Sequence, residues 1–597
     1  MCGIAGRIDW NNPVKSDSVS RMCEKMKYRG PDDSGIVCLN NAALGHRRLS
    51  IIDLSHNASQ PMACCNNRYF IVYNGEVYNF QALRNELENS GVIFKTFSDT
   101  EVILYAYINW GIKCLDKFNG MFALAVWDEQ KKELFLARDR FGKKPLYYYR
   151  DPGKLIFASE LNALLCDQDV PRDVSYEALN SYLALGYILS PLTVYKDVFK
   201  LEASTYLLIS DKGNKVTKIR YWNYADRFRV KSRNNENDIA SDLLVYLDEA
   251  VRKRMVSDVP VGAFLSGGID SSSVVESMRN GRQGQLHTFS VGFTQGGYDE
   301  SSDARQAAEW MKTIHHDKVC SAGTDSVLFN DAINAFDEPF ADTSLIPTFE
   351  LSKLASSYVK VALSGDGADE IFAGYITYVA DRYYPYTKLL PGIVKKLLMR
   401  MPEYLAQSSK RKKISSRYKQ GQFFYGSLHP AEQAHYLWRI IFKPEERVAI
   451  LGQNYRDLIY DTDPYLTFKK YYSQTRDLHW LDRHLYVDAM TWMTDDILVK
   501  VDRASMRNSL EVRSPYLDVD LASFAASIPA ELKLKGLTTK YILKKALRNK
   551  LPGFILKKKK SGFNAPVGDW IGYRGDNEFQ AFNQFVLKKY FRKGPAA

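Results

Sequence analysis

The sequence predicts two domains of different class, an α+β half followed by an α/β half. In the first half, short apolar strands come in groups with helices between them, so this half is β-rich. In the second half, helices and apolar strands alternate, which is typical of a parallel sheet with helical crossovers. The polar segment Asp226–Ile239, DRFRVKSRNNENDI, indicates a linker between them, and a helix over Ala240–Arg254 follows. We therefore expect domains at residues 2–222 and 240–597.

Length and composition exclude several classes of protein. At 597 residues the chain exceeds the usual size of one domain, roughly 100–200 residues. A hydrophobic content of 45% and an aromatic content of 13% are sufficient for packed cores. The sequence has no run of about eighteen apolar residues, and no basic region followed by an apolar stretch opens it. We therefore expect no membrane span and no secretory signal.

The charge and the cysteines suggest a cytoplasmic protein that handles small anions. The formal net charge is +12, but basic residues are spread along the chain, which favours anionic substrates over nucleic acid. The eight cysteines form no Cys-x-x-Cys pair, and the adjacent Cys64 and Cys65 do not have the spacing of zinc ligands. Reduced thiols are expected, as in the cytoplasm.

Cys2 is the first candidate for chemistry. It follows Met1, and a small residue in second place usually leads to removal of that methionine. Cys2 would then carry both a thiol and a free α-amino group, whose unperturbed pKa of about 8 suits a base near neutrality. A nucleophile activated by its own amine is one solution to covalent catalysis. The alternative is an ordinary buried thiol.

The rest of the first half supplies polar residues at strand and helix ends. A strand over Tyr69–Tyr73 leads into Asn74-Gly75-Glu76, where Asn-Gly predicts either a type I′ hairpin turn or an oxyanion hole. Ser98-Asp99-Thr100-Glu101 predicts a cap for a helix over Val102–Trp110. In Gly45–Asp53 a basic pair precedes an apolar strand, and further strands are expected at Phe118–Asp128, at Leu134–Arg138 and up to Phe157–Glu160.

Four of these motifs, in this order, resemble the class II glutamine amidotransferase domain. They are Cys2-Gly3-Ile4, Arg48-Leu49-Ser50, Asn74-Gly75-Glu76 and Ser98-Asp99. The resemblance implies an αββα sandwich of the N-terminal-nucleophile type, with Cys2 attacking the side-chain amide of glutamine. Asn74 and Gly75 would stabilise the oxyanion. The implied glutamine-binding residues are Arg48 for the α-carboxylate, Asp99 with Glu76 for the α-amino group, and Leu49, Ser50, Asn74 and Gly75 around them.

The second half opens on a candidate phosphate site. An apolar strand over Val261–Leu265 runs into Ser266-Gly267-Gly268, and Ile269-Asp270-Ser271-Ser272-Ser273 begins a helix. Adjacent glycines let backbone amides approach a ligand, and the positive end of a helix favours an anion. Ser266, Ser271 and Ser272 add hydroxyl donors, and Asp270 can hold Mg²⁺. The string lacks the Gly-Lys-Ser/Thr of a Walker loop and resembles the pyrophosphate loop of ATP pyrophosphatases.

Two more strands predict the opposite wall of that site. They are His287–Val291 and Val359–Leu363, and the second leads directly into Ser364-Gly365-Asp366-Gly367-Ala368-Asp369-Glu370. Ligands of open parallel sheets bind beyond the carboxyl ends of the strands. Asp270 and Asp369 would then share Mg²⁺, whereas the alternative is a solvated acidic turn.

Together the two loops resemble the synthetase domain of the asparagine synthetase (glutamine-hydrolysing) family, and with the first half the resemblance covers nearly the whole chain. It implies ATP as co-substrate, with Mg²⁺ on Asp270 and Asp369. Asp366 and Asp369 would lie at the acceptor. The implied ATP-binding residues are Leu265, Val291, Ser364 and Gly365 around adenine and ribose, and Ser266, Gly267, Gly268, Asp270, Ser271 and Ser272 around pyrophosphate.

The remaining segments give weaker predictions. Residues 376–480 have helical spacing and are interpreted as scaffold without chemistry. Lys500, Asp502 and Arg503 lie in a helical run, as site residues or as ion pairs on a solvated face. Lys557–Lys560 precedes Ser561-Gly562-Phe563, and the resemblance assigns Lys560 to the charge that develops on an acyl-adenylate.

These predictions combine into a two-site ligase. Cys2 would release ammonia from glutamine, and the second half would adenylate a carboxylate and transfer the ammonia to it through an internal passage. Aspartate is the default acceptor. Because the acidic loop carries Asp366 where many family members have Glu, another carboxylate, such as a uronic acid of a surface polysaccharide, is the main alternative. A nucleic-acid-binding protein is a second alternative, and pairing into a homodimer is expected from the family.

Overall fold

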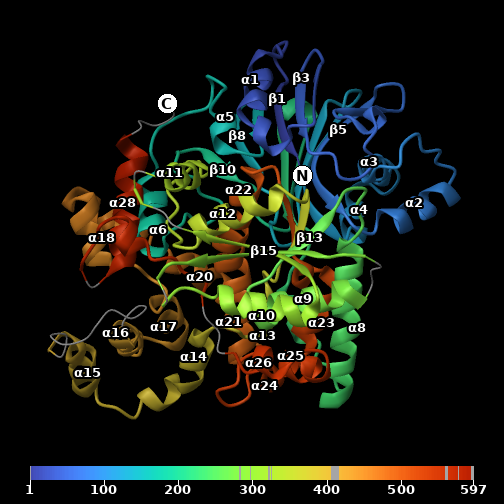
Figure 1. Cartoon of the computed structure of the whole chain (residues 1–597). Coiled ribbons are helices and arrows are strands. Elements are labelled where there is room, and N and C mark those ends of the chain that lie inside the picture. The colour runs from blue at the N-terminus through green and yellow to red at the C-terminus, as the bar shows by residue number, and fades with distance from the viewer. Residues whose placement is uncertain are drawn as a thin grey trace.

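The computed structural model describes residues 2–280, 284–295, 297–320, 323–324, 326–404, 416–558, 562–575 and 577–592. Figure 1 shows the N-terminal half, drawn in blue and teal, above a second half built around a short central sheet. Within the described part of the chain, no helix combines the length and the apolarity needed to cross a membrane. All eight cysteines are free thiols.

The N-terminal half contains two antiparallel sheets, each with six strands in the described residues. Both sheets are antiparallel at every pairing of neighbouring strands. In order across the first sheet the strands are β10 (Val198–Lys200), β8 (Tyr147–Asp151), β9 (Lys154–Ala158), β1 (Gly3–Asp9), β3 (Ala42–Arg48) and β2 (Asp33–Cys38). Across the second they are β12 (Lys215–Arg220), β11 (Thr205–Ser210), β7 (Glu133–Arg138), β6 (Gly120–Asp128), β5 (Tyr69–Val77) and β4 (Met62–Cys64).

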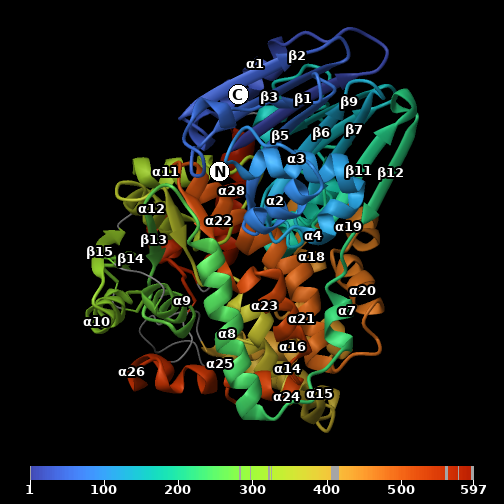
Figure 2. The same ribbon diagram turned by 90° about the vertical axis from the view of Figure 1, so that its right-hand side faces the viewer.

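These sheets form the middle layers of the predicted αββα sandwich. An apolar cluster with Ile4, Leu44, Val72 and Trp127 fills the space between them, because alternate residues of each strand face inward. Helix α1 (Asp17–Lys25) covers the outer face of the first sheet, and α2 (Phe80–Asn89) and α3 (Asp99–Trp110) cover the second (Figure 2). Ser98 caps α3 as predicted, since its side chain accepts a hydrogen bond from the Glu101 amide.

The second half is built on a parallel sheet with five strands in the described residues, so the predicted fold class is confirmed for both halves. Its strands, in order, are β15 (Ile314–Cys320), β14 (His287–Phe293), β13 (Val261–Phe264), β16 (Val361–Leu363) and β17 (Glu511–Arg513). Helices α12 (Leu345–Ser356) and α22 (Leu498–Met506) pack on one face; on the other lie α8 (Glu236–Arg254), α9 (Ile269–Asn280) and α10 (Ser301–Met311).

Most of the remaining second half is helical. The described helices of residues 376–480 are α14 (Ile376–Thr387), α15 (Gly392–Tyr404), α16 (Ser416–Gly426), α17 (Ala431–Leu437), α18 (Pro444–Leu451), α19 (Arg456–Asp461) and α20 (Tyr465–Ser473). After them come α21 (Trp480–Asp488), the π-helical segment η6 (Ala489–Ile497), α23 (Val519–Ser527), α25 (Tyr541–Ala546), α26 (Gly553–Leu556) and α28 (Glu578–Arg592).

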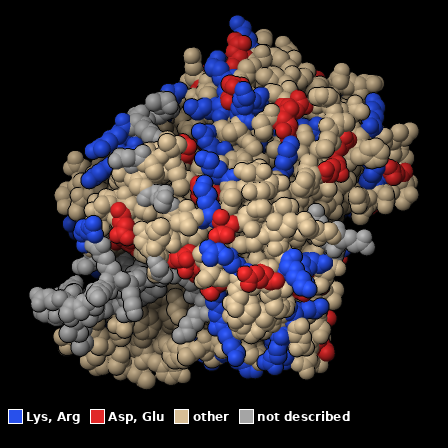
Figure 3. All heavy atoms as spheres, viewed as in Figure 1, with Lys and Arg blue, Asp and Glu red and all other residues tan. Residues whose placement is uncertain are grey.

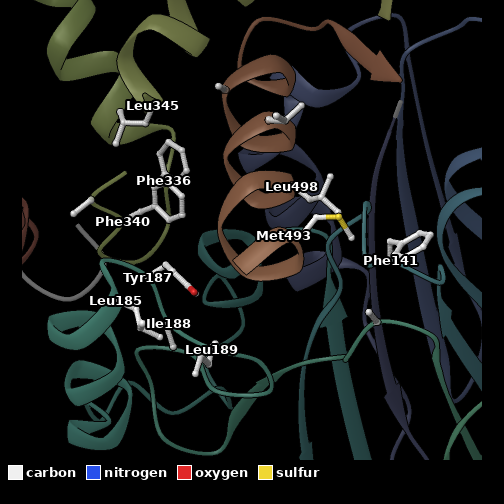
Figure 4. Packing of buried hydrophobic residues seen from close by; sticks show 14 of the residues in the cluster. Phe141, Leu185, Tyr187, Ile188, Leu189, Phe336, Phe340, Leu345, Met493 and Leu498 are labelled. Atoms are coloured by element: carbon white, nitrogen blue, oxygen red, sulfur yellow. The ribbon is translucent and has the colours of Figure 1, made fainter. Parts of the chain in front are cut away.

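The segment predicted as a linker between the halves contains helical structure. Helix α7 (Ala225–Arg229) lies inside it, and α8 already begins at Glu236, where the Asn235 side chain accepts from two amides of the first turn. A single apolar cluster also contains residues of both halves. Figure 4 shows Phe141 of the first half and Phe336, Phe340 and Leu345 of the second on either side of the helical segment with Met493 and Leu498. The division at 222 and 240 therefore stays a prediction.

Candidate active sites

Cys2 and the Asn74-Gly75-Glu76 motif meet because the two sheets of the N-terminal half are stacked. Cys2 directly precedes β1 in the first sheet, whereas the motif lies in β5 of the second. The Cys2 nitrogen donates to Asn74 Oδ1 at 3.0 Å, and its carbonyl accepts from Arg29 Nε at 3.1 Å. Burial raises the pKa of the Cys2 thiol. A buried thiol of this kind needs a base beside it to become a nucleophile.

Asn74 and Gly75 are not in a turn. Both lie inside β5, opposite Ala123 and Phe122 of β6, so the hairpin alternative is wrong. Asn74 is fully buried, and among the described residues its Nδ2 has no hydrogen-bond partner. A Cβ on Gly75 would lie 2.1 Å from the Met121 carbonyl oxygen, so only glycine fits there. The free amide donor next to Cys2 is what an oxyanion would require.

Arg48 ends β3 with its guanidinium fixed by backbone oxygens. Its Nη1 donates to the Ser55 carbonyl at 2.8 Å, and its Nη2 donates to the carbonyls of Ile52 and Asp53. Leu49 next to it is buried, and the Ser50 amide donates to Asp32. Neutral carbonyls orient a guanidinium without cancelling its charge, so Arg48 keeps its attraction for an anion.

Two buried carboxyl groups complete this site. Asp99 accepts from the Tyr73 hydroxyl at 2.9 Å and the Val77 amide at 3.1 Å, but burial outweighs these bonds and raises its pKa to about 6. Burial, reinforced by Asp99, also raises the pKa of Glu76 well above its usual value. Among the described residues Glu76 Oε1 has no partner. Such groups are stabilised when a cation binds beside them.

The second site is a cavity of about 550 Å³ at the carboxyl ends of β13, β14 and β16. Its volume suits a small-molecule ligand. Most of the predicted ATP and acceptor residues line it, namely Leu265, Ser266, Asp270, Ser271, Val291, Ser364, Gly365, Asp366 and Asp369. Gly267, Gly268 and Ser272 do not line it, although they belong to the same loop and helix start.

The serine–glycine loop is closed by its own side chains. The Ser266 amide donates to Ser271 Oγ at 3.1 Å, and the two hydroxyls lie 3.1 Å apart. Gly267 has φ +69°, and a Cβ there would lie 2.6 Å from the Asp303 backbone. A Cβ on Gly365 would lie 2.9 Å from Asp270 Cβ. Both glycines are therefore needed for close approach between the loop and its neighbours.

Lys540 joins the two predicted metal ligands, and sequence reasoning did not find it. Its Nζ lies 2.6 Å from both carboxylate oxygens of Asp270 and 2.5 Å from Asp369 Oδ1. It precedes α25 with φ +53°. Asp366 accepts from the Ser364 hydroxyl at 2.7 Å. The ammonium group shows that the two carboxylates converge on one point where a cation is stabilised.

The lysine run after α26 reaches the same loop. Lys558 Nζ donates to the Ser266 carbonyl at 3.2 Å and lies 2.8 Å from Asp303 Oδ2. Lys560, the predicted catalytic lysine, lies outside the described residues.

Lys500, Asp502 and Arg503 are buried, so a solvated face is wrong for all three. Lys500 lines the cavity and pairs with Asp342 at 2.7 Å. Asp502 and Arg503 face the N-terminal half instead. The buried ion pairs there are Arg29–Glu160, Arg29–Asp502, Lys144–Asp502, Arg503–Glu160 and Arg503–Asp337, at 2.9 to 3.3 Å.

The two sites are connected through β17. Arg513 on this strand places Nη2 3.5 Å from Glu76 Oε2 at the Cys2 site, while its carbonyl accepts from the Ser364 amide at the cavity. Both the Cys2 site and the cavity at the carboxyl ends of the strands therefore contact the same residue of β17.

Residues 376–480 contribute to the cavity, which their interpretation as mere scaffold did not foresee. Gln422, Trp438, Arg439, Ile440 and Ile441 form part of its lining. Helical periodicity gave no signal for this, because these residues lie more than 50 positions beyond the acidic loop in the sequence.

Comparisons with known proteins agree with this geometry. The family model described as asparagine synthase matches residues 242–584, and the one described as a glutamine amidotransferase domain matches residues 1–222. Asparagine synthetase (glutamine-hydrolysing) 1 of Bacillus subtilis is 34% identical over 96% of this chain and 88% of its own length. Asparagine synthetase (glutamine-hydrolysing) 3 of the same organism is 31% identical over 94% of this chain and 87% of its own.

Proposed function

The chain belongs to the family of glutamine-hydrolysing asparagine synthetases, and we propose that each of its two sites performs one half of that reaction. The activity is glutamine-dependent amide synthesis: glutamine is hydrolysed to ammonia, aspartate is adenylated by ATP, and ammonia converts the adenylate to asparagine and AMP. The observation that carries the proposal is the pairing of two polar sites, Cys2 against Asn74 and the cavity at Ser266, with strand β17 in contact with both. Relatives along the whole chain favour aspartate over the uronic-acid alternative.

In the N-terminal half, the Cys2 sulfur adds to the amide carbon of glutamine, and its proton passes to the α-amine that removal of Met1 would expose. Asn74 Nδ2 and the Gly75 amide then donate to the oxyanion, since the Asn74 donor is buried and otherwise unpaired. The C–N bond breaks, ammonia leaves, and water hydrolyses the thioester to glutamate. Arg48 binds the α-carboxylate and Asp99 with Glu76 binds the α-ammonium, while Leu49 and Ser50 line the site.

In the second half, an oxygen of the aspartate side chain attacks the α-phosphorus of ATP and pyrophosphate leaves. The loop from Ser266 to Ser272 and the start of α9 bind the phosphates, and Leu265, Val291, Ser364 and Gly365 surround adenine and ribose. Ammonia next attacks the acyl carbon and AMP departs. Lys540 and Lys558 supply positive charge at the phosphates, since both already contact the loop or its carboxylate.

Mg²⁺ fits the same place. Asp270 and Asp369 converge on one cation, and carboxylate oxygens are the ligands that Mg²⁺ prefers. When bound there it would neutralise phosphate charge. Removal of divalent ions with EDTA should stop aspartate-dependent pyrophosphate release and leave glutamine hydrolysis intact; loss of both activities, or of neither, would contradict this assignment.

Ammonia must travel from the Cys2 site to the cavity. The strand β17 has three residues, which corresponds to roughly 10 Å at about 3.3 Å per residue. We place the passage along this strand, because free ammonia would be protonated and lost in water. The domain boundaries at 222 and 240, a cytoplasmic location and a homodimer are part of the same proposal.

We also propose that the protein has no nucleic-acid partner. On the face shown in Figure 3, Lys and Arg side chains are interspersed with Asp and Glu, which gives no continuous basic track for a phosphate backbone.

Substitution of the nucleophile tests the two-site proposal. Cys2→Ala should abolish asparagine synthesis from glutamine and leave synthesis from added ammonium salts within about twofold, because Cys2 does not line the cavity. Asparagine and AMP would be quantified with each nitrogen source. Loss of both activities in a folded variant would refute separable sites.

A further inference from the structure

One end of the cavity contains several buried polar atoms without partners. They come from three parts of the chain, and all lie on residues that line the cavity. Among the described residues, Tyr187 Oη, Arg439 Nε and both carboxylate oxygens of Asp496 have no hydrogen-bond partner. Buried polar groups are normally paired, and each unpaired one costs free energy. Unpaired atoms in a cavity wall therefore indicate groups that a ligand satisfies.

These residues are neighbours. Trp492 lies at their centre, with its ring centroid 5.1 Å from the Arg439 guanidinium carbon and 5.9 Å from the centroid of the Tyr187 ring. Asp496 follows Trp492 by four residues in the same helical segment, and Lys500 follows by four more. The spacing of four places them on one face of the helix.

The guanidinium group of Arg439 is fixed by hydrogen bonds from one of its nitrogens, Nη2. Its side chain is 7% exposed, and Nη2 donates to Asp488 and to Thr377 Oγ1. The guanidinium also stacks over the Tyr375 ring at 5.5 Å. No hydrogen bond from Nε fixes the remaining edge. A guanidinium fixed on one side can present its other donors to a carboxylate.

Asp488, which fixes Arg439, is itself shared with a second cation. His435 Nε2 lies 3.0 Å from Asp488 and its Nδ1 lies 2.7 Å from Asp381. Burial would lower the pKa of His435, but the two carboxylates raise it to about 9, so the ring is an imidazolium at neutral pH. Asp488 is thus divided between two cations and does not belong to Arg439 alone.

Asp496 is an acidic group, so it would attract the cationic part of a ligand where Arg439 would attract the anionic part. Lys500, one helical turn away, is paired with Asp342 at 2.7 Å and forms no ion pair with Asp496. Burial, together with the Asp342 carboxylate, raises the pKa of Asp496 well above its usual value. A cationic group of a ligand would stabilise the ionised carboxylate at this position.

We propose that this end of the cavity recognises the main-chain groups of an amino-acid acceptor, with Arg439 and Tyr187 binding its α-carboxylate and Asp496 its α-ammonium. The side-chain carboxylate would then extend toward Ser364 and Asp366 at the nucleotide loop. This inference rests on the proposed function, and it makes residues 376–480 part of acceptor selection.

Substrate analogues and two conservative variants test the inference. Succinate lacks the α-amino group of aspartate, and β-alanine lacks its α-carboxylate. In the wild-type protein both should give ATP-dependent pyrophosphate release at least about 100-fold below that of aspartate in kcat/KM, because a site built for a polar group rejects its absence. Asp496→Asn should reduce the preference over succinate to about tenfold or less, and Arg439→Lys should do so for β-alanine.

The KM for ATP separates this assignment from a phosphate site. Each variant should raise the KM for aspartate at least about 30-fold and leave the KM for ATP within about twofold. Arg456→Met, at an exposed arginine of the same region, is the matched control and should change neither value. Asp496→Asn is nearly isosteric and its amide can hydrogen-bond to Asp342, so it should fold, and glutamine hydrolysis by the same sample verifies this.

The outcomes are distinguishable. If the wild-type protein releases pyrophosphate with another carboxylate but not with aspartate, the proposed function fails. If it uses aspartate but both variants keep the wild-type preferences, or raise the KM for ATP instead, only the assignment of Arg439 and Asp496 is overturned.

Discussion

Asp99 can bind a cation only when it is ionised, and its surroundings set the pH at which that happens. Its pKa is about 6, raised from the usual value by burial despite the hydrogen bonds from Tyr73 and Val77. As the pH falls through 6 the group gains a proton and loses its attraction for an ammonium group.

The KM for glutamine should therefore depend on pH in one direction. Below pH 6 it should rise by about tenfold per unit of pH. Asp99→Asn should give a high KM that no longer shows this step near pH 6. Steady-state glutamate production at each pH measures this, and a wild-type KM that stays flat down to pH 5 would exclude Asp99 from binding the α-amino group.

The contacts of Lys540 lead to a second prediction at the residue scale, on the rate of pyrophosphate release. Because its ammonium group bridges Asp270 and Asp369, Lys540→Met should remove the positive charge that orients both carboxylates beside the phosphates. Aspartate-dependent pyrophosphate release should fall by about 100-fold or more, the size typical for loss of one preorganised charge. Lys550→Met, at an exposed lysine nearby, serves as control. A loss of less than about fivefold would remove Lys540 from the site.

At the scale of elements, strand β5 needs a glycine at position 75 both for packing against β6 and for the proposed oxyanion hole. Gly75 lets the strand lie against β6, where a methyl group would meet the Met121 carbonyl oxygen at 2.1 Å. Gly75→Ala should therefore destabilise the protein by about 2 kcal/mol or more, because a backbone atom cannot move aside easily.

Thermal or denaturant unfolding would measure that loss. Gly553→Ala is a matched control, since a Cβ there meets nothing within 4 Å, and it should change the free energy of unfolding by less than about 0.5 kcal/mol. Equal stability of the two variants would show that β5 and β6 separate at no cost.

The strands of the nucleotide site could be predicted because glycines and carboxylates follow short apolar runs. The prediction failed where tertiary contacts replaced a local pattern. Strand β17 has a buried charge at each end, Glu511 and Arg513, which neutralise each other at 2.6 Å, so it has no apolar run to find. Lys540 lies 171 residues beyond Asp369, and the residues next to it form no motif that would predict its contact with Asp369. Asn74-Gly75 suggested a turn, but its glycine serves close approach between strands.

At the scale of the whole molecule, the halves are joined by buried charges as well as by apolar contacts. Arg29 is fully buried, donates to the Cys2 carbonyl, and pairs with Asp502 on α22, the helix whose Lys500 lines the cavity. One helix thus contacts both sites. A displacement of α22 would therefore move Cys2 through the guanidinium group of Arg29.

Asp502→Ala tests that connection. The variant leaves buried cations without their carboxylate and should lose about 3–5 kcal/mol of stability. The ratio of glutamate formed to asparagine formed should also rise above its wild-type value. Without Asp502, Arg29 no longer fixes the position of Cys2 relative to the cavity, so more ammonia is lost before it reaches the acceptor. Lys360→Ala removes an exposed pair with Asp32 across the same interface and should cost less than about 1 kcal/mol. An unchanged ratio in a folded Asp502→Ala protein would argue against coupling through Arg29.

The apolar cluster shared by the two halves also has a consequence for biosynthesis. Phe141 packs on Trp222 and Tyr224, but it also shares its cluster with residues such as Met493, which leave the ribosome hundreds of codons later. The nascent amidotransferase half therefore exposes part of this apolar cluster to solvent. Because translation adds about 5–20 residues per second, the exposure lasts tens of seconds. Chaperone capture of the growing chain, and aggregation of a separately expressed first half, are the expected results.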